Sequence, residues 1–159
     1  MNFNSKIIQV AYDKIKNLVV KTPIITNDFI NNFLEAEVYF KLENLQHTGS
    51  FKLRGASHKI SLLFNNNNNN NGVVAYSSGN HAQAVAYAAL NKNISAKIIM
   101  PKSAPKIKIE NTKSLNAEVI LYDTFFENRE EIGNKIKEKE NRYLIKPYDD
   151  LDIIAGQGT

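Results

Sequence analysis

From Val73 onward the chain alternates short apolar segments with amphipathic ones, and this alternation constrains its fold more than any other feature. The strand-like segments are residues 73–76, 96–100, 118–121 and 143–145, and the helical segments between them are 80–90, 105–115 and 125–140. Strands that are separated by single crossover helices run parallel to one another. The pattern therefore predicts an α/β domain with helices layered on a parallel sheet.

The stretch before Val73 has a different pattern. Residues 3–18 predict an amphipathic helix that ends before Thr22-Pro23, residues 38–42 predict a strand, and residues 51–64 predict a second helix. A single strand cannot complete a sheet, so this region needs partners from elsewhere. We therefore separate residues 1–72 from residues 73–147.

Two segments lie outside these patterns. Seven consecutive asparagines, Asn65–Asn71, have no apolar face to bury and predict a solvated loop. Residues 148–159 follow the last strand as a loop rich in aspartate. Within them, residues 156–159 have the pattern of a helix entrance with Thr159 as its cap, so we expect the chain to stop in mid-domain.

Composition excludes several classes of protein. The chain has no cysteine, which rules out disulfides and thiolate metal sites, and its three histidines lack metal-ligand spacing, so we expect no metal site. No apolar run approaches the roughly 18 residues of a membrane span, and residues 1–6 lack the pattern of a signal peptide. We expect a cytoplasmic protein with no membrane partner.

The net charge of +4 does not indicate a nucleic-acid partner. The basic residues are mostly scattered lysines and include only three arginines. The densest group comprises Lys102, Lys106, Lys108 and Lys113. We interpret this group as the solvated face of one helix.

The first candidate for chemistry is Lys52, in the segment Gly49-Ser50-Phe51-Lys52-Leu53-Arg54-Gly55-Ala56. The pattern predicts that Lys52 lies at the start of a helix among apolar side chains. Burial and a helix N-terminus both favour the neutral amine, which is the form that reacts with aldehydes. On spacing alone, a surface lysine is the alternative.

The second candidate is the segment Ser77-Ser78-Gly79-Asn80-His81, between an apolar strand and an alanine-rich helix. A turn that leads into a helix directs backbone N–H groups at an anion, and ligands of open α/β sheets bind beyond the carboxyl ends of the strands. The segment suits a carboxylate or a phosphate. The alternative is an ordinary turn in which Ser78 or Asn80 caps the helix.

Together, the two segments resemble the fold-type-II pyridoxal-phosphate enzymes, and within them the branch of serine racemases and threonine/serine dehydratases. The resemblance extends over essentially the whole chain and includes Thr22-Pro23, Met100-Pro101 and residues 41–46, 128–131 and 154–159. It implies a three-layer, tryptophan synthase beta-like fold with a parallel sheet, here truncated. Residues 1–72 would be part of the large domain, 73–147 a complete small α/β domain, and 148–159 the start of the return to the large domain.

The resemblance also implies roles for individual residues. Lys52 would bind pyridoxal 5'-phosphate covalently and act as a base on one face of the substrate α-carbon, while Phe51 flanks the cofactor ring and Asn80 bonds its 3-hydroxyl. Ser77, Ser78, Gly79, Asn80 and His81 would hold the substrate carboxylate. Ser78 matches the acid/base of the opposite face in serine racemases. The implied activity interconverts L- and D-serine and eliminates water from serine or threonine, which gives a 2-oxo acid and ammonia.

Two alternatives stay open: a threonine dehydratase without racemase activity, and a non-catalytic remnant that associates with a full-length relative. A homodimer is a further possible assembly. In the family, the glycine-rich loop that holds the cofactor phosphate and the ligands of a divalent cation lie beyond the position of Thr159. We therefore expect the 159 residues alone to bind the cofactor weakly, because charge-assisted hydrogen bonds to the phosphate would be missing.

Overall fold

The computed structural model describes residues 4–64 and 71–159, so most of the asparagine tract lies outside the described residues. The elements of the first part are α1 (Ser5–Ile15), β1 (Ile24–Ile25), α2 (Asp28–Leu34), β2 (Phe40–Lys41), a short 3-10 helix (Glu43–Leu45) and α3 (Lys52–Leu63). Those of the second part are β3 (Val73–Tyr76), α4 (Asn80–Leu90), β4 (Ala96–Pro101), α5 (Lys106–Ser114), β5 (Glu118–Tyr122), α6 (Arg129–Glu140), β6 (Tyr143–Leu144) and α7 (Leu151–Gln157). Within the described ranges, no helix combines the length and the apolar character that spanning a membrane requires.

Four parallel strands form the main sheet, in the order β5-β4-β3-β6. The predicted parallel sheet is therefore confirmed. Successive strands β3, β4 and β5 add in one direction, and β6 then returns to the other side of β3. The strand order reverses between β3 and β6, and such a reversal opens a crevice at the carboxyl ends of the two strands.

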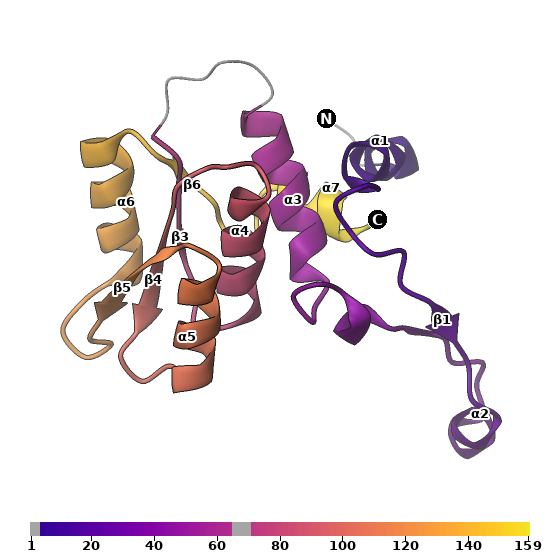
Figure 1. Ribbon diagram of the computed structural model, residues 1–159. Helices are drawn as coiled ribbons and strands as arrows, with labels where there is room; N and C mark the ends of the chain where they lie inside the picture. The colour runs from indigo at the N-terminus through magenta and orange to yellow at the C-terminus, as the bar shows by residue number, and fades with distance from the viewer. Residues whose placement is uncertain (1–3, 65–70) are drawn as a thin grey trace.

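Helices cover both faces of the sheet and make three layers (Figure 1). On one face, Val73 and Ala75 of β3 and Ile98 of β4 pack in a large cluster with the alanines of α4. On the other face, Val74 and Ile99 pack in a smaller cluster against α6. Because both faces of β3 are covered, all four of its residues are buried, as is usual for a central parallel strand.

Helix α3 joins the N-terminal segments to the helices that cover the main sheet. It packs between α4 and α7, and α1 lies against α7 as well (Figure 1). Helices α3 and α7 cross closely. A Cβ atom on Gly156 of α7 would lie 2.8 Å from the backbone oxygen of Arg54 and 2.8 Å from the Cα of Gly55. The two glycines allow this approach.

The predicted helix over 125–140 starts later in the structure. Helix α6 begins at Arg129, and Phe125 and Phe126 are 90% and 88% exposed in the preceding turn. The side chain of Asn128 accepts hydrogen bonds from the backbone N–H groups of Glu130 and Glu131. This N-cap fixes the start of α6 more strongly than the apolar pattern that includes the two phenylalanines.

The prediction that residues 156–159 form a helix entrance capped by Thr159 is wrong. Helix α7 already begins at Leu151 and ends at Gln157. Asp150 is its N-cap, and its carboxylate accepts hydrogen bonds from the backbone N–H groups of Asp152 and Ile153. The aspartate-rich segment that we expected to be a loop therefore contains the N-cap of a helix.

The N-terminal elements also differ from their predicted bounds. Helix α1 ends at Ile15, well before Thr22-Pro23, and the strand predicted over 38–42 is reduced to the two residues of β2. Strand β2 pairs antiparallel with β1, which was not predicted. Helix α2 was not predicted either. Its apolar residues Phe29, Ile30, Phe33 and Leu34 share one face, but the helix has only seven residues and none of them is buried.

Candidate active site

The candidate site lies at the carboxyl ends of β3 and β6, where the strand order reverses. The loop after β3 contains Ser77, Ser78 and Gly79 and leads into α4. The segment after β6 contains Pro147 and leads to α7. Lys52, from the start of α3, reaches this segment, so the fold brings together the two regions that the sequence singled out.

Lys52 is the first residue of α3 and is partly buried. Its Nζ donates a hydrogen bond of 2.7 Å to the backbone oxygen of Pro147 and lies 5.2 Å from the centre of the Phe51 ring. No carboxylate of the described residues forms an ion pair with it. Because burial disfavours the charged ammonium, the pKa of the Lys52 amine is lowered from its ordinary value.

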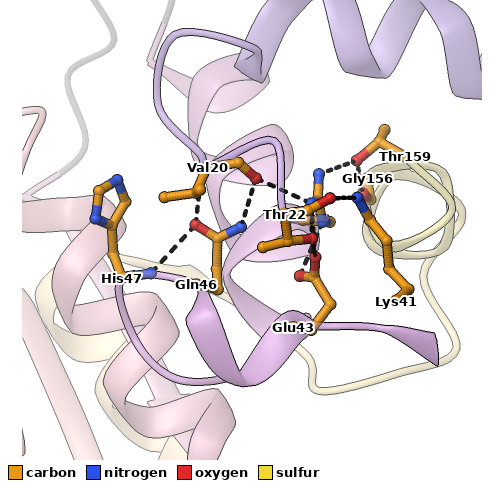
Figure 2. A network of polar contacts seen from close by, with 9 residues as sticks. Val20, Thr22, Lys41, Glu43, Gln46, His47, Gly156 and Thr159 are labelled. Atoms are coloured by element: carbon orange, nitrogen blue, oxygen red, sulfur yellow. Dashed lines mark hydrogen bonds and ion pairs between the residues drawn. The ribbon is translucent and has the colours of Figure 1, made fainter. Parts of the chain in front are cut away.

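A buried ion pair anchors the start of α3. Arg54 is 2% exposed and binds Glu43 through two hydrogen bonds, from Nη2 to Oε1 at 2.7 Å and from Nε to Oε2 at 2.9 Å. Thr22 donates to the same carboxylate at 2.6 Å (Figure 2). Burial alone would raise the pKa of Glu43, but the hydrogen bonds from Arg54 and Thr22 outweigh it and hold the pKa below its usual value.

The same network ties the turn before α3 to the segment after α1. The side chain of Gln46 accepts from the backbone N–H of Val20 at 2.8 Å and donates to the Val20 oxygen at 3.0 Å (Figure 2). The backbone N–H of Gly49 donates a hydrogen bond of 2.8 Å to the backbone oxygen of Gln46, and Gly49 has a φ of 67°. That left-handed conformation is one that glycine adopts without steric cost, and it turns the chain toward Lys52.

Helix α7 holds α3 from the other side. Lys59 Nζ lies 2.8 Å from Asp150 Oδ2 and 2.7 Å from Asp152 Oδ2, at the first turn of α7. The ring Nδ1 of His58 is within 2.8 Å of the Asp152 backbone oxygen. Lys52 and its acceptor Pro147 are thus fixed relative to each other by polar contacts between α3 and the chain leading into α7.

The loop after β3 leaves donors free at the start of α4. Gly79 is the N-cap residue of this helix, and no side chain caps it, so the alternative in which Ser78 or Asn80 is the cap is wrong. Ser78 and Asn80 are exposed, and neither side chain bonds another described residue. Ser77 Oγ accepts a hydrogen bond of 3.1 Å from the Gly79 N–H and shapes the turn.

His81 differs from the rest of this segment. Its side chain is 3% exposed, and its Nε2 lies 3.1 Å from the backbone oxygen of Ile145, directly after β6. Its Nδ1 is buried and has no partner among the described residues. Burial, together with the nearby charge of Lys52, lowers the pKa of His81 to about 4. The imidazole is therefore neutral at pH 7 and links α4 to β6 rather than facing solvent with Ser78.

The described residues contain no cluster of three or more histidine, cysteine, aspartate or glutamate side chains that could hold a metal ion. The arrangement instead offers an amine with a lowered pKa, a free hydroxyl and the uncapped N-terminus of a helix. These groups suit the binding of a small molecule that carries an aldehyde or a carboxylate. The fold thus defines an α/β protein whose candidate ligand site lies at its topological switch point.

Comparison with known proteins identifies the family. Residues 15–159 match the family model described as pyridoxal-phosphate dependent enzyme. The chain belongs to this family of pyridoxal-phosphate-dependent enzymes.

Curated relatives lie in the branch that the sequence motifs indicated. The chain is 45% identical over 149 residues to an L-threo-3-hydroxyaspartate ammonia-lyase of Saccharomyces cerevisiae and to a serine racemase of Schizosaccharomyces pombe. These matches cover 94% of the chain and 45% and 46% of the two relatives. An L-threonine ammonia-lyase of Thermotoga maritima is 43% identical over 152 residues, which are 96% of the chain and 38% of that protein.

Solved structures confirm the fold class. A pyridoxal 5'-phosphate-dependent aspartate racemase superposes with a TM-score of 0.91 and 33% identity, over 98% of the chain and 49% of that structure. A serine racemase from Dictyostelium discoideum gives a TM-score of 0.85 and 38% identity, over 95% of the chain and 49% of that structure. The chain spans about half the length of the relatives that it matches.

The residues of this chain fit part of the implied cofactor. The aldehyde of pyridoxal phosphate needs an uncharged amine, and Lys52 has a lowered pKa, a neutral carbonyl as its acceptor and an aromatic ring beside it. Phe51 is 45% exposed, so part of its surface is available for contact with another planar group.

The sequence could not identify the residues that support Lys52. Arg54 and Glu43 both lie in motifs that the resemblance covers, but they are separated by 11 positions and follow no common period. The one available signal was Arg54 itself, which stands between Leu53 and Gly55 on a helix of mostly buried residues. A charged residue in such a helix indicates a paired, buried charge.

Proposed function

We propose that the chain carries the reactive lysine and the substrate-carboxylate loop of a serine racemase-like enzyme. In this proposal the enzyme interconverts L- and D-serine and also eliminates water from serine or threonine. The observation that carries the proposal is Lys52: its amine, with a lowered pKa, bonds the Pro147 oxygen in the segment that follows β6. Strand β6 pairs in parallel with β3, and Ser78, with an exposed side chain, lies in the loop that follows β3. We include in the proposal a cytoplasmic location and the division into residues 1–72, 73–147 and 148–159.

Pyridoxal phosphate, when bound, supplies an aldehyde that captures amines and a ring that stabilises negative charge at the α-carbon. Lys52 would hold the cofactor and then, as a free amine, take or return the α-proton at its Nζ. Its acceptor, the Pro147 oxygen, is uncharged and so does not lock the amine in the protonated form. Phe51 would contact the cofactor ring, and Asn80 would bond its 3-hydroxyl.

The substrate carboxylate would bind at the start of α4. The N-cap of this helix has no side-chain partner, so its first N–H groups are available to an anion. Ser77 keeps the turn in shape through its bond from the Gly79 N–H. The buried side chain of His81 holds the same turn to the end of β6, which leaves its backbone as the part that can face the substrate.

Ser78 distinguishes racemisation from elimination. Racemisation needs a proton donor on each face of the α-carbon, whereas elimination needs only removal of the α-proton and loss of the side-chain hydroxyl. In the complete enzyme, Ser78→Ala should therefore lower racemisation by about 100-fold or more and elimination far less. Ser77→Ala, which removes a contact within the loop, should lower both rates together. Equal loss of both rates in Ser78→Ala would contradict the acid/base role of Ser78.

The substrate is tested by assaying D-serine, pyruvate and ammonia formation from L-serine, L-threonine and L-threo-3-hydroxyaspartate. The proposal expects D-serine and pyruvate from L-serine. Elimination from threonine without any D-serine would favour a threonine ammonia-lyase. Cofactor binding without turnover of any of the three would favour the non-catalytic alternative, in which the chain acts through association with a longer relative.

A further inference from the structure

Lys108 lies beside the loop that we propose for the substrate carboxylate. It belongs to the first turn of α5, and its Nζ is 3.2 Å from the position that a Cβ atom would take on Gly79. Helix α5 contacts α4, which starts at this loop. The ammonium group therefore lies against the turn.

The sequence had placed Lys108 with three other lysines on the solvated face of one helix, and the structure separates it from them. Lys106 and Lys113 are exposed, and Lys102 lies 3.8 Å from Asp123. Lys108 is half-buried, and no carboxylate of residues 4–64 and 71–159 lies within ion-pair distance of its Nζ. A partly desolvated ammonium group that has no carboxylate partner can still form an ion pair with an anionic ligand.

The backbone fixes Lys108 at this position. The Thr112 hydroxyl, on a fully buried residue, donates a hydrogen bond of 2.7 Å to the Lys108 oxygen. The Lys108 N–H donates to the Pro105 oxygen at 2.9 Å, which closes the first turn of α5. These contacts hold the Cα of Lys108, so its flexible side chain extends from a rigid base toward Gly79.

We propose that Lys108 is a substrate-binding residue that pairs with the α-carboxylate of an amino acid held at the Ser77–His81 loop. This inference rests on the proposed function, because it takes the loop to be the carboxylate site. The N–H groups at the start of α4 would bind the carboxylate oxygens from one side, and the Lys108 ammonium would neutralise their charge from α5. The ligand class is an α-amino acid with a free carboxylate.

The test compares L-serine with L-serinamide, which replaces the carboxylate by a neutral amide. Dissociation constants are measured on the chain without cofactor, from the NMR shifts of the Gly79 and Asn80 amides. The variants are Lys108→Met, which removes the charge at similar length, Lys108→Arg, which keeps it, and Lys106→Met as a matched control on the same helix. Each variant must keep the dispersed amide spectrum of the unmodified chain.

We expect the unmodified chain, Lys106→Met and Lys108→Arg to prefer serine over serinamide by about tenfold or more, and Lys108→Met to lose most of this preference. If Lys108→Met keeps the full preference, the loop binds carboxylates without Lys108 and the inference is overturned. If the unmodified chain shows no preference, the carboxylate site itself is wrong, and the proposed function of the loop fails with it.

A second arm separates the substrate from the cofactor phosphate. Borohydride capture of pyridoxal phosphate is compared with capture of pyridoxal, which lacks the phosphate, in the unmodified chain and in Lys108→Met. We expect the ratio of the two captures to be unchanged by the substitution. A selective loss of pyridoxal phosphate capture would mean that Lys108 binds the phosphate and would overturn the assignment to the carboxylate.

Discussion

The close crossing of α3 and α7 leads to a sharp prediction for Gly156→Ala. A Cβ atom at this position would lie 2.7 Å from the Cβ of His58 and 2.8 Å from both the Arg54 oxygen and the Gly55 Cα. Two of these three atoms are backbone, and the third is bonded directly to it, so none can turn aside as the end of a flexible side chain could. The two helices must separate to admit the methyl group.

The magnitude follows from two opposing effects. Alanine is about 1 kcal/mol more favourable than glycine inside a helix, so propensity alone predicts stabilisation. Overpacking a close contact costs typically about 1–3 kcal/mol, and more when backbone must shift. Because the obstructing atoms here are rigid, we expect a net destabilisation of about 1–2 kcal/mol, which corresponds to a Tm lower by about 2–8 °C for a chain of this size.

Gly158→Ala is the matched control. Gly158 has helical dihedral angles. The close contacts of its new Cβ would be with the flexible side chain of Ile8, at 3.0 and 3.2 Å, and the Ala155 backbone oxygen would lie at an ordinary 3.6 Å. Its Tm should stay within about 2 °C of the unmodified protein or rise slightly. Thermal unfolding followed by circular dichroism measures both variants. An unchanged or higher Tm for Gly156→Ala would refute the close crossing on which the position of Lys52 depends.

Two further predictions concern stability. Glu43→Ala leaves the Arg54 charge buried without its partner and should lower the free energy of unfolding, measured by urea denaturation, by roughly 3 kcal/mol. The control is Asp13→Ala, which removes an exposed ion pair and should leave the urea midpoint almost unchanged. A small effect of Glu43→Ala would contradict the buried network. Protonation of His81, whose folded pKa is about 4, opposes folding, so the free energy of unfolding should fall as the pH drops from about 6.5 toward 4. Because the His81→Asn variant lacks this titration, its urea midpoints at pH 7 and pH 4.5 should differ less than those of the unmodified protein; an equal difference would contradict the buried neutral imidazole.

The parallel sheet and its first crossover helix were predictable because their local sequence signals agree with their tertiary packing. Strand β3 and helix α4 have the predicted bounds, Val73–Tyr76 and Asn80–Leu90, since an apolar run and an alanine-rich stripe are separated by a Gly-containing turn. The left-handed conformation of Asn116, at a φ of 62°, is likewise what the end of a helix favours.

Helix α7 was not predictable for a physical reason. Its seven residues include Gly156, whose helix propensity is low, and its cap Asp150 follows another aspartate. Both features indicate a loop when taken locally. The helix is stabilised by packing on α3 and by the contacts of Lys59 with Asp150 and Asp152, which join positions about 90 residues apart.

In the candidate site too, features carried by neighbouring residues were predictable from the sequence, whereas those that depend on long-range contacts were not. The motifs predicted Lys52 and the Ser77–His81 loop as candidates, because their chemistry is carried by residues close together in sequence. Lys108 could not be told from its neighbours Lys102 and Lys106, since all three are lysines around the start of one helix. Only the contact between α4 and α5, which brings its ammonium to Gly79, distinguishes it.

The central claim is that Lys52 is the residue that binds pyridoxal phosphate, and Lys59 provides an internal comparison on the same helix. Burial lowers the pKa of Lys52. Burial acts on Lys59 in the same direction, but Asp150 and Asp152 outweigh it and raise the pKa of Lys59. At neutral pH, the uncharged amine that reacts with an aldehyde is therefore more abundant at Lys52.

The most direct measurement is to incubate the chain with less than one equivalent of pyridoxal phosphate, reduce it with borohydride and locate the modified lysine by peptide mass spectrometry. Covalent capture detects the cofactor even if its affinity is low. We predict that Lys52 carries most of the modification, that Lys59 carries almost none, and that Lys52→Arg loses the modified peptide. Modification spread evenly over the lysines, or concentrated at any lysine other than Lys52, would contradict the account.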